Sequence, residues 1–255
     1  MPDTAIALRH VEHVMGTVFS FDVRDRPTPA IRDALAAAVH HLHRVDAVFS
    51  TYRADSHISR LDRGEIRLKD CPPEVHEVLS LCAHATYASD GWFSIVPRGT
   101  LDPSGLVKGW ATEAASRILH DAGARHTCVN GGGDVQLRGQ AGPGTAWRVG
   151  VAHPLRPGEL VTVVTAGHDL AVATSGTAER GAHIVDPHSG RPADALASLT
   201  LVGPGLTLTD TYATAAFARG EGAQAWLETL DGYEALAVLP DGREWRTPGF
   251  SRYGT

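Results

Sequence analysis

The sequence has little basic charge, few cysteines and no long apolar run, and each shortage removes a class of function. Its 255 residues carry 23 lysines and arginines against 29 aspartates and glutamates, which gives a formal net charge of −6. Without a basic excess, we expect no nucleic-acid partner. The three cysteines, Cys71, Cys82 and Cys128, are odd in number and too widely spaced for a disulfide framework or a zinc motif. We interpret them as buried, reduced thiols.

Membrane-directing segments are also missing from the sequence as written. No stretch approaches the ~18 consecutive apolar residues of a transmembrane helix. The start of the chain reaches the polar stretch His10-Val11-Glu12-His13 without an apolar signal core or a lipid-attachment cysteine. We therefore expect a cytoplasmic protein. With 43% hydrophobic residues, the chain can bury a substantial core.

Hydrophobic periodicity predicts helices and strands in an irregular order. The predicted helices span residues 27–48, 74–89, 109–121, 208–219 and 223–230, and the predicted strands span residues 14–23, 127–129, 135–137, 147–151, 160–165, 170–173, 183–185, 199–202 and 235–239. Because strands and helices do not alternate regularly, we favour an α+β fold with mixed sheets and packed helices over a doubly wound α/β fold. The Gly/Pro-rich stretch at 139–145 is interpreted as a loop, so residues 1–255 are expected to form a single domain.

The most conspicuous motif is Val129-Asn130-Gly131-Gly132-Gly133-Asp134, in which three glycines follow a predicted strand. Glycine adopts positive φ and has no Cβ, so such a run lets a ligand approach the backbone closely. A tight turn between two strands is the alternative, although it would need only one or two glycines. We favour a ligand-binding role. The run is not a dinucleotide-binding loop, because it lacks the GxGxxG spacing and the following helix.

Charged and hydroxyl side chains stand near two predicted helices. Lys108 lies close to the start of one, where free backbone N–H groups and a positive charge would suit a phosphate; a solvated surface lysine is the alternative. Asp210 and Thr214 stand four residues apart on one face of another helix and present hard oxygen ligands of the kind that Mg²⁺ prefers. The alternative is that Asp210 only offsets the helix dipole.

A polar loop and a histidine complete the set of candidate residues. Ala173-Thr174-Ser175-Gly176 is followed by His183, beside a predicted strand. An imidazole titrates near neutral pH, so His183 could act as a general base toward a hydroxyl nucleophile. Asp186 or a metal-bound water could take the same role.

Taken together and in this order, these segments resemble the FAD:protein FMN transferase family, also called the ApbE-like or thiamine-biosynthesis lipoprotein family. The resembling segments span nearly the whole chain, at residues 15–17, 49–53, 56–61, 91–94, 102–110, 130–134, 173–176, 183–187 and 210–214. The resemblance implies a T-fold-related domain that binds FAD in a central cleft. It further implies a Mg²⁺-dependent transfer of FMN, through a phosphodiester, to a threonine or serine of an acceptor protein, with release of AMP.

The resemblance also assigns roles to individual residues. The flavin contacts match Met15, Tyr52, Trp92, Phe93, Ser94, Asp102, Lys108 and Ile184, although core packing is an alternative for Phe93. To these cofactor contacts we add His183 and the two small-residue motifs, Asn130, Gly131, Gly132 and Gly133 with Thr174, Ser175 and Gly176. The metal ligands match Asp210, Thr214 and a carbonyl oxygen at Gly105, and His183 matches the histidine that activates the acceptor hydroxyl.

The chain departs from the family pattern at several points. Ser94 stands where an aspartate is common, and Asp62 stands where an asparagine is usual. The same site could instead hydrolyse FAD to FMN and AMP, with water in place of the protein hydroxyl. A flavin-binding protein without turnover is a third possibility, but such a protein would need no metal site.

Overall fold

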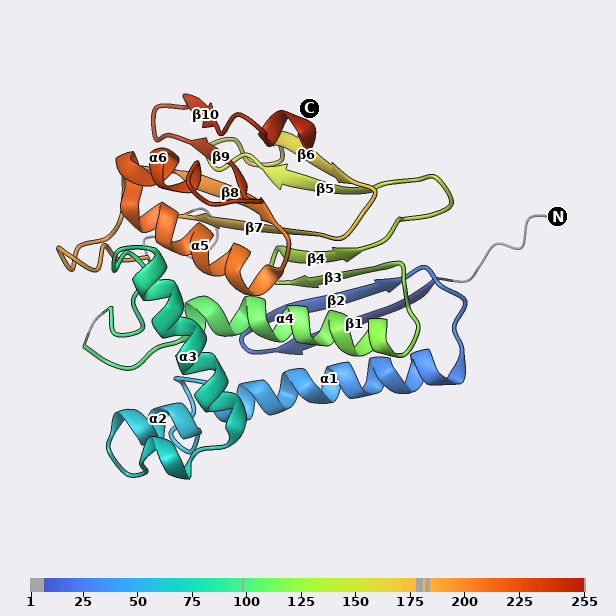
Figure 1. The fold of residues 1–255 in the computed structure, drawn as a ribbon, viewed down its shortest axis with the longest axis horizontal. Helices are drawn as coiled ribbons and strands as arrows, with labels where there is room; N and C mark the ends of the chain where they lie inside the picture. The colour runs from blue at the N-terminus through green and yellow to red at the C-terminus, as the bar shows by residue number, and fades with distance from the viewer. Residues whose placement is uncertain (1–6, 98, 178–180, 182–183, 255) are drawn as a thin grey trace.

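Antiparallel β-structure forms the framework of the computed structural model, which describes residues 7–97, 99–177, 181 and 184–254. The strands are β1 (Leu8–Val14), β2 (Thr17–Val23), β3 (Thr127–Gly131), β4 (Asp134–Arg138), β5 (Trp147–Ala152), β6 (Leu160–Ala166), β7 (Leu170–Gly176), β8 (Ser198–Gly203), β9 (Glu234–Val238) and β10 (Glu244–Arg246). One sheet has the order β1-β2-β3-β4-β7-β8-β9-β10, and β5 and β6 form a separate hairpin (Figure 1).

Six α-helices accompany these strands in the described part of the chain. They are α1 (Pro29–Phe49), α2 (His57–Asp62), α3 (Pro73–Ala88), α4 (Ser104–Asp121), α5 (Leu206–Arg219) and α6 (Ala223–Leu227), with short 3₁₀ turns at Leu68–Asp70, Gly220–Gly222 and Phe250–Arg252. None of these described helices has both the length and the hydrophobicity needed to cross a bilayer.

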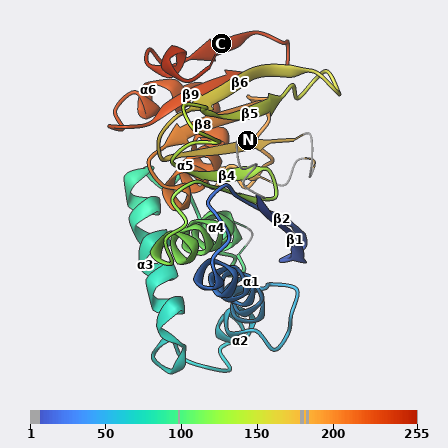
Figure 2. The ribbon, with the colours of Figure 1, turned by 90° about the vertical axis from the view of Figure 1, so that its right-hand side faces the viewer.

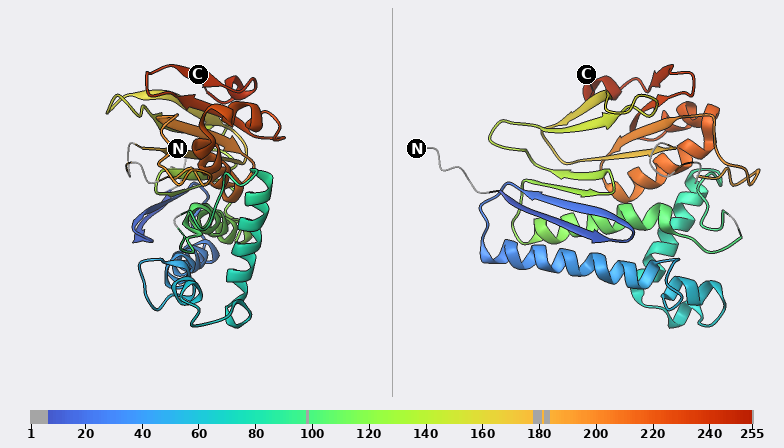
Figure 3. Two further views of the ribbon diagram at one scale, coloured as in Figure 1. Left: turned by 90° about the vertical axis from the view of Figure 1, so that its left-hand side faces the viewer. Right: turned by 180° about the vertical axis from the view of Figure 1, so that it is seen from behind.

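The helices and the β5–β6 hairpin cover opposite faces of the large sheet. Helices α4 and α5 pack against each other and against β3, β7 and β8, with α3 on their outer side (Figure 2). Helix α1 lies along α4 and the β1–β2 hairpin (Figure 3). This helical side holds the main hydrophobic core, which includes Phe19, Leu106 and Phe217. A second core around Leu137 and Val164 lies between the sheet and the β5–β6 hairpin.

The α+β class predicted from the sequence is confirmed, with one refinement. Every strand pair in the described residues is antiparallel, so the sheets are not mixed. For the β1–β2 and β3–β4 pairs the reason is a tight hairpin, which can only join antiparallel neighbours. The α5 and α6 helices and the strands from β3 to β9 lie close to their predicted positions. Residue 183 of the predicted strand at 183–185 lies outside the described residues, and Val185 makes only an isolated β-bridge to Pro192, so no strand is formed at 184–185.

Two predictions about single elements need correction, and two elements are missing from the predicted set. The predicted strand at 14–23 is a hairpin, because Met15 and Gly16 form its turn and β1 precedes them. Helix α4 begins at Ser104 rather than at 109, so Lys108 lies inside the helix and not at its start. The short elements α2 and β10 were not predicted from the sequence at all.

Candidate functional site

Three buried charges from three different elements meet on the sheet side of α4. Lys108 of α4 lies between Asp134, at the start of β4, and Asp210 of α5, and it donates hydrogen bonds to both carboxylates. The Lys108 Nζ to Asp210 Oδ2 distance is 2.8 Å. The side chains of Lys108, Asp134 and Asp210 are 17%, 6% and 8% exposed. Buried charges require partners of opposite sign, and here each acid is paired with the same lysine.

The surroundings shift the proton affinities of this cluster. Burial by itself would lower the pKa of Lys108, but the carboxylates of Asp134 and Asp210 outweigh it and raise that pKa above its usual range. Burial raises the pKa of Asp210 to about 6; Lys108 opposes this rise and Asp134 adds to it. Lys108 therefore stays protonated. With both acids ionised the cluster carries a net charge of −1, which favours a further cation.

Close packing of α4 on α5 brings these groups together. A Cβ atom built on Gly109 would lie 2.7 Å from the Leu206 carbonyl oxygen and 2.9 Å from the Cβ of Asp210. Only glycine therefore allows the two helices to approach this closely beside Asp210. On the sheet side, Asp134 Oδ1 accepts a hydrogen bond of 2.8 Å from the backbone N–H of Thr174, which ties the carboxylate to β7.

Hard oxygen donors gather next to Asp210. Thr214 follows Asp210 by one helical turn, and its hydroxyl lies 3.4 Å from the hydroxyl of Ser175. Gly105 is also adjacent, since a Cβ built there would lie 3.8 Å from the Cγ2 atom of Thr214. A carboxylate, two hydroxyls and a nearby backbone fit Mg²⁺, which keeps several water or phosphate ligands and needs few from the protein. The described residues include no cluster of three or more His, Cys, Asp or Glu placed to hold a metal, so these oxygens would have to suffice.

The triple-glycine motif forms a tight β-hairpin, which was the alternative interpretation. Gly131 ends β3 opposite Asp134, and the two-residue turn uses Gly132 and Gly133 with φ of 60° and 98°. Asn130 Oδ1 accepts a hydrogen bond from Gly133 N. The expectation that a turn would need only one or two glycines is wrong here. A Cβ on Gly131 would lie 2.4 Å from the hydroxyl of Thr112, so packing requires the third glycine as well.

The turn of the β1–β2 hairpin lies beside the glycine turn. Met15, half-buried, has a φ of 56° and shares this turn with Gly16. Gly132 N donates to the carbonyl oxygen of Val18 at 2.9 Å, and a Cβ on Gly132 would lie 2.6 Å from the hydroxyl of Thr17. Met15 and the glycines of the β3–β4 turn therefore lie close together at one end of the sheet. Their predicted role in cofactor binding stays a prediction.

The predicted aromatic contacts differ in exposure. Tyr52 is 99% exposed, whereas Phe93 is 2% exposed and packs in the main core, which was the alternative for that residue. Trp92 is half-buried, and its ring meets His188 edge to face at 4.5 Å between centroids. Only Tyr52 and Trp92 thus offer accessible ring surface.

The remaining predicted contacts lie in loops and at the end of β7. The Ser94 hydroxyl and the Asp102 carboxylate accept hydrogen bonds from the N–H groups of Val96 and Ser104 within their own loop. Ser175 is buried, the Thr174 hydroxyl bonds Thr200, and Gly176 ends β7.

Of the two predicted residues in the 183–184 segment, one can be placed. Ile184 is buried, and its carbonyl oxygen accepts a hydrogen bond from Ala193 N. His183, the predicted general base, lies outside the described residues.

A match to a known family decides the classification of the chain. The model of the ApbE family matches residues 15–100 and 96–237, which together cover most of the sequence. This chain belongs to the ApbE family. The Lys108 cluster and the β3–β4 hairpin lie inside the matched residues, as do the Met15–Gly16 turn and β2.

Curated relatives carry a functional name. The chain is 28% identical to an FAD:protein FMN transferase of Vibrio cholerae over 147 residues, which are 54% of this chain and 44% of that protein. It is 32% identical to an FAD:protein FMN transferase of Rhodobacter capsulatus over 161 residues, 60% of this chain and 30% of that protein. The matched part therefore spans less than half the length of these two relatives.

Solved structures share the fold along nearly the whole chain. The ApbE protein of Thermotoga maritima superposes with a TM-score of 0.87 at 20% identity, covering 98% of this chain and 99% of that one. The apo flavinyl transferase ApbE of Pseudomonas stutzeri gives 0.82 at 23% identity, covering 96% of each chain. At these identities the likeness establishes the fold.

Sequence reasoning missed three residues that the structure places at or beside the site. Asp134 was noted only as the end of the glycine motif, and Glu113 and Gln136 were not singled out. An acidic residue directly after a glycine turn, at the start of a buried strand, was the available signal for Asp134. Glu113 and Gln136 bond α5 from a distance in sequence, so no local pattern marks them.

Proposed function

We propose that this chain is a Mg²⁺-dependent FAD:protein FMN transferase. It cleaves FAD and attaches FMN through a phosphodiester to a threonine or serine hydroxyl of an acceptor protein, releasing AMP. The proposal rests on membership of the ApbE family and on the names of the curated relatives. The observation that carries it is the buried Lys108–Asp134–Asp210 cluster beside the hydroxyls of Ser175 and Thr214.

In the proposed reaction, the acceptor hydroxyl oxygen forms a bond to the FMN phosphorus, and the bond from that phosphorus to the bridging oxygen breaks. AMP leaves with the bridging oxygen, and the hydroxyl proton passes to a base. Lys108 supplies a fixed positive charge for the phosphates, because its two carboxylate partners keep it protonated. We retain His183 as the base on the resemblance alone.

The proposed metal site consists of Asp210, Thr214 and the carbonyl oxygen of Gly105. A bound Mg²⁺ supplies charge that stabilises the phosphates as negative charge develops on the leaving group. The ion pair with Lys108 already holds the Asp210 carboxylate in place. A bound cation would be the second positive charge on that carboxylate. Tyr52 and Trp92 would provide stacking surface for the ring systems of FAD.

The proposal extends to the whole chain and its surroundings. We propose that residues 1–255 act as a single domain, that FAD lies in a cleft beside the Lys108 cluster, and that the protein works in the cytoplasm. The other expected cofactor contacts, Met15, Phe93, Ser94, Asp102, Asn130, Gly131, Gly132, Gly133, Thr174, Ser175, Gly176 and Ile184, belong to the same proposal.

The test combines purified protein with FAD, MgCl₂ and a threonine-containing peptide. Chromatography measures AMP, and mass spectrometry detects FMN on the peptide. We expect both products from the wild type and neither from Asp210→Ala, while Asp231→Ala, at an exposed turn residue, should behave as wild type. AMP with free FMN but no modified peptide would indicate hydrolysis instead, and FAD bound but intact would refute an enzymatic role.

A further inference from the structure

Helix α5 begins without a capping side chain of its own. Its N-cap is Gly205, which makes no side-chain hydrogen bond. The first two amides are bonded from other elements: Leu206 N donates to Gln136 Oε1 at 2.9 Å, and Thr207 N donates to Glu113 Oε2 at 2.7 Å. The Thr207 hydroxyl donates to the same Glu113 oxygen at 2.7 Å.

The two residues that cap α5 come from the same elements that carry the site charges. Glu113 lies on α4, five residues after Lys108, and Gln136 lies on β4, two residues after Asp134. Side chains two apart on a strand share a face, so Gln136 and Asp134 both point toward the helices. Two of the three elements that give a charged group to the site, α4 and β4, therefore also hold the first turn of α5, which carries the third.

The hydrogen bonds from Thr207 to Glu113 fix the position of the first turn of α5. A carboxylate at a helix N-terminus is stabilised by the free N–H groups and by the helix dipole. The Glu113 carboxylate also packs closely against the helix start, since a Cβ on Gly205 would lie only 3.0 Å from Glu113 Oε1. Asp210 follows Leu206 by four residues, and Thr214 follows Asp210 by four, so a shift of the first turn moves both.

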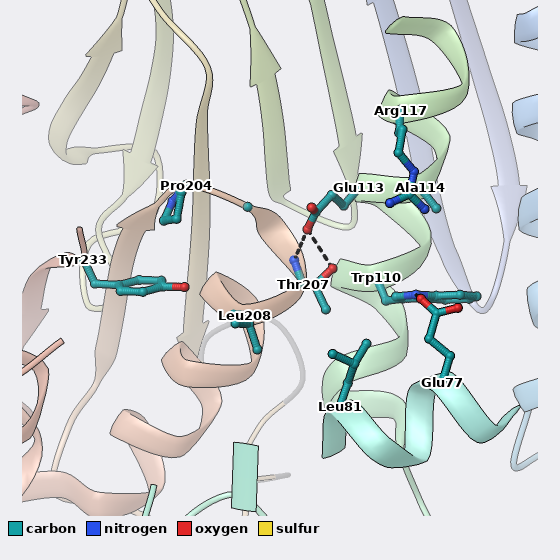
Figure 4. A pocket seen from close by; sticks show the side chains of 11 residues that line it. Glu77, Leu81, Trp110, Glu113, Ala114, Arg117, Pro204, Thr207, Leu208 and Tyr233 are labelled. Carbon is teal, nitrogen blue, oxygen red and sulfur yellow. Dashed lines mark hydrogen bonds between the residues drawn. The ribbon is translucent and has the colours of Figure 1, made fainter. Parts of the chain in front are cut away.

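We propose that Glu113 is a positioning residue, which holds Asp210 and Thr214 in place beside Lys108 by capping α5 at Thr207. This inference rests on the metal site of the proposed function. Glu113 acts through the helix and not by contact with the reacting groups. It borders a cavity of about 450 Å³ whose lining includes Glu77, Trp110, Arg117 and Tyr233 but neither Lys108 nor Asp210 (Figure 4).

The test measures metal binding directly, by titrating the purified protein with Mn²⁺ and following free Mn²⁺ by electron paramagnetic resonance. We expect Glu113→Ala to weaken Mn²⁺ binding about tenfold, because loss of a residue that orients metal ligands typically lowers affinity by at least that factor. Glu113→Gln keeps an acceptor oxygen and should restore part of the affinity. Glu77→Ala is the matched control, because Glu77 borders the same cavity but accepts its hydrogen bond from Trp110 of α4 and not from α5.

A second readout, amide hydrogen exchange in α5, separates positioning from global stability and does not need the metal. Faster exchange through Asp210 in Glu113→Ala, with wild-type rates in Glu77→Ala, supports the inference. Unchanged Mn²⁺ affinity and unchanged exchange in Glu113→Ala overturn it. If Glu113→Ala does not fold, Thr207→Ala, which removes the hydroxyl donor to Glu113, replaces it. The same changes in Mn²⁺ affinity and hydrogen exchange then support or overturn the inference. If the wild type binds no Mn²⁺, the metal part of the proposed function fails, and hydrogen exchange alone then decides the role of Glu113.

Discussion

Removing the positive charge from the buried cluster should destabilise the protein strongly. Lys108→Met keeps the length and apolar stem of the side chain but leaves Asp134 and Asp210 facing each other without a cation. Both acids are less than a tenth exposed, so water cannot replace the lysine fully. The change therefore tests whether the cluster is a paired unit or three side chains that are solvated independently.

The magnitude follows from the geometry. At 2.8 Å and an effective dielectric constant of ~20, the Lys108–Asp210 contact corresponds to roughly 6 kcal/mol of Coulomb attraction. The cost of burying the charges offsets much of this, and removing one partner of a buried pair typically costs about 3–5 kcal/mol. Because Lys108 retains 17% exposure, we expect about 3 kcal/mol, at the lower end of that range.

Urea unfolding without added metal measures this loss. Asp210→Asn in the Lys108→Met background should recover about 1–2 kcal/mol, because it removes one of the two uncompensated charges. Lys69→Met, at an exposed lysine, is the control and should stay within about 0.5 kcal/mol of wild type. A loss below about 1 kcal/mol in Lys108→Met, or no recovery in the double variant, would show that the three groups are not coupled as the structure indicates.

Three further predictions concern backbone geometry and a half-buried histidine. Gly132→Ala should cost about 1–3 kcal/mol more than Gly16→Ala, because both glycines have positive φ but only Gly132 would place its Cβ against Thr17; equal thermal shifts would contradict this. Gly109→Ala should lower stability by about 1–3 kcal/mol and weaken Mn²⁺ binding, since its Cβ would push against Asp210; normal binding would show that α5 can move freely. Burial lowers the pKa of His41 below 6.5, so the unfolded state takes up a proton first as the pH falls, and stability should drop from about pH 6.5 downward. His41→Gln should lessen that drop in urea midpoints measured between pH 7.5 and 5.5, and an identical pH profile would exclude His41 as the cause.

Much of the fold follows from periodicity, and the exceptions have physical causes. The strands from β3 to β9 carry apolar residues on their buried faces, so their pattern is visible locally. In β1 the half-buried face carries Leu8, His10, Glu12 and Val14, and its two central polar residues hide the alternation. A hydrogen bond of 3.0 Å joins His10 Nε2 and Glu12 Oε2 there, which satisfies both groups at the sheet surface but gives no apolar signal in the sequence.

The site could be predicted only where its parts are close in sequence. Asp210 and Thr214 share one helix face, so their pairing follows from helical spacing. Asp134 is 26 residues from Lys108 and Asp210 is 102 residues from it, and only the packing of α4 and α5 against each other and against β4 brings them together. The role of the glycine run is open for the opposite reason: a ligand loop and a tightly packed hairpin demand the same residue, so the hairpin turn that the structure shows leaves ligand binding there a prediction.

The sequence was hardest to interpret at the start of α4, where the site lies. Gly105 and Gly109 stand four residues apart on one face of that helix, against Thr214 and Asp210 of α5. Each glycine inside a helix costs about 1 kcal/mol relative to alanine, so together they weaken the local helix signal and moved the predicted start to residue 109. The same missing side chains allow α5 to approach Lys108. Gly105 and Gly109 therefore cause both the close packing of α4 on α5 and the weak helix signal in the sequence. The packing at Lys108 requires these glycines in the first turns of α4, even though they make the helix harder to predict.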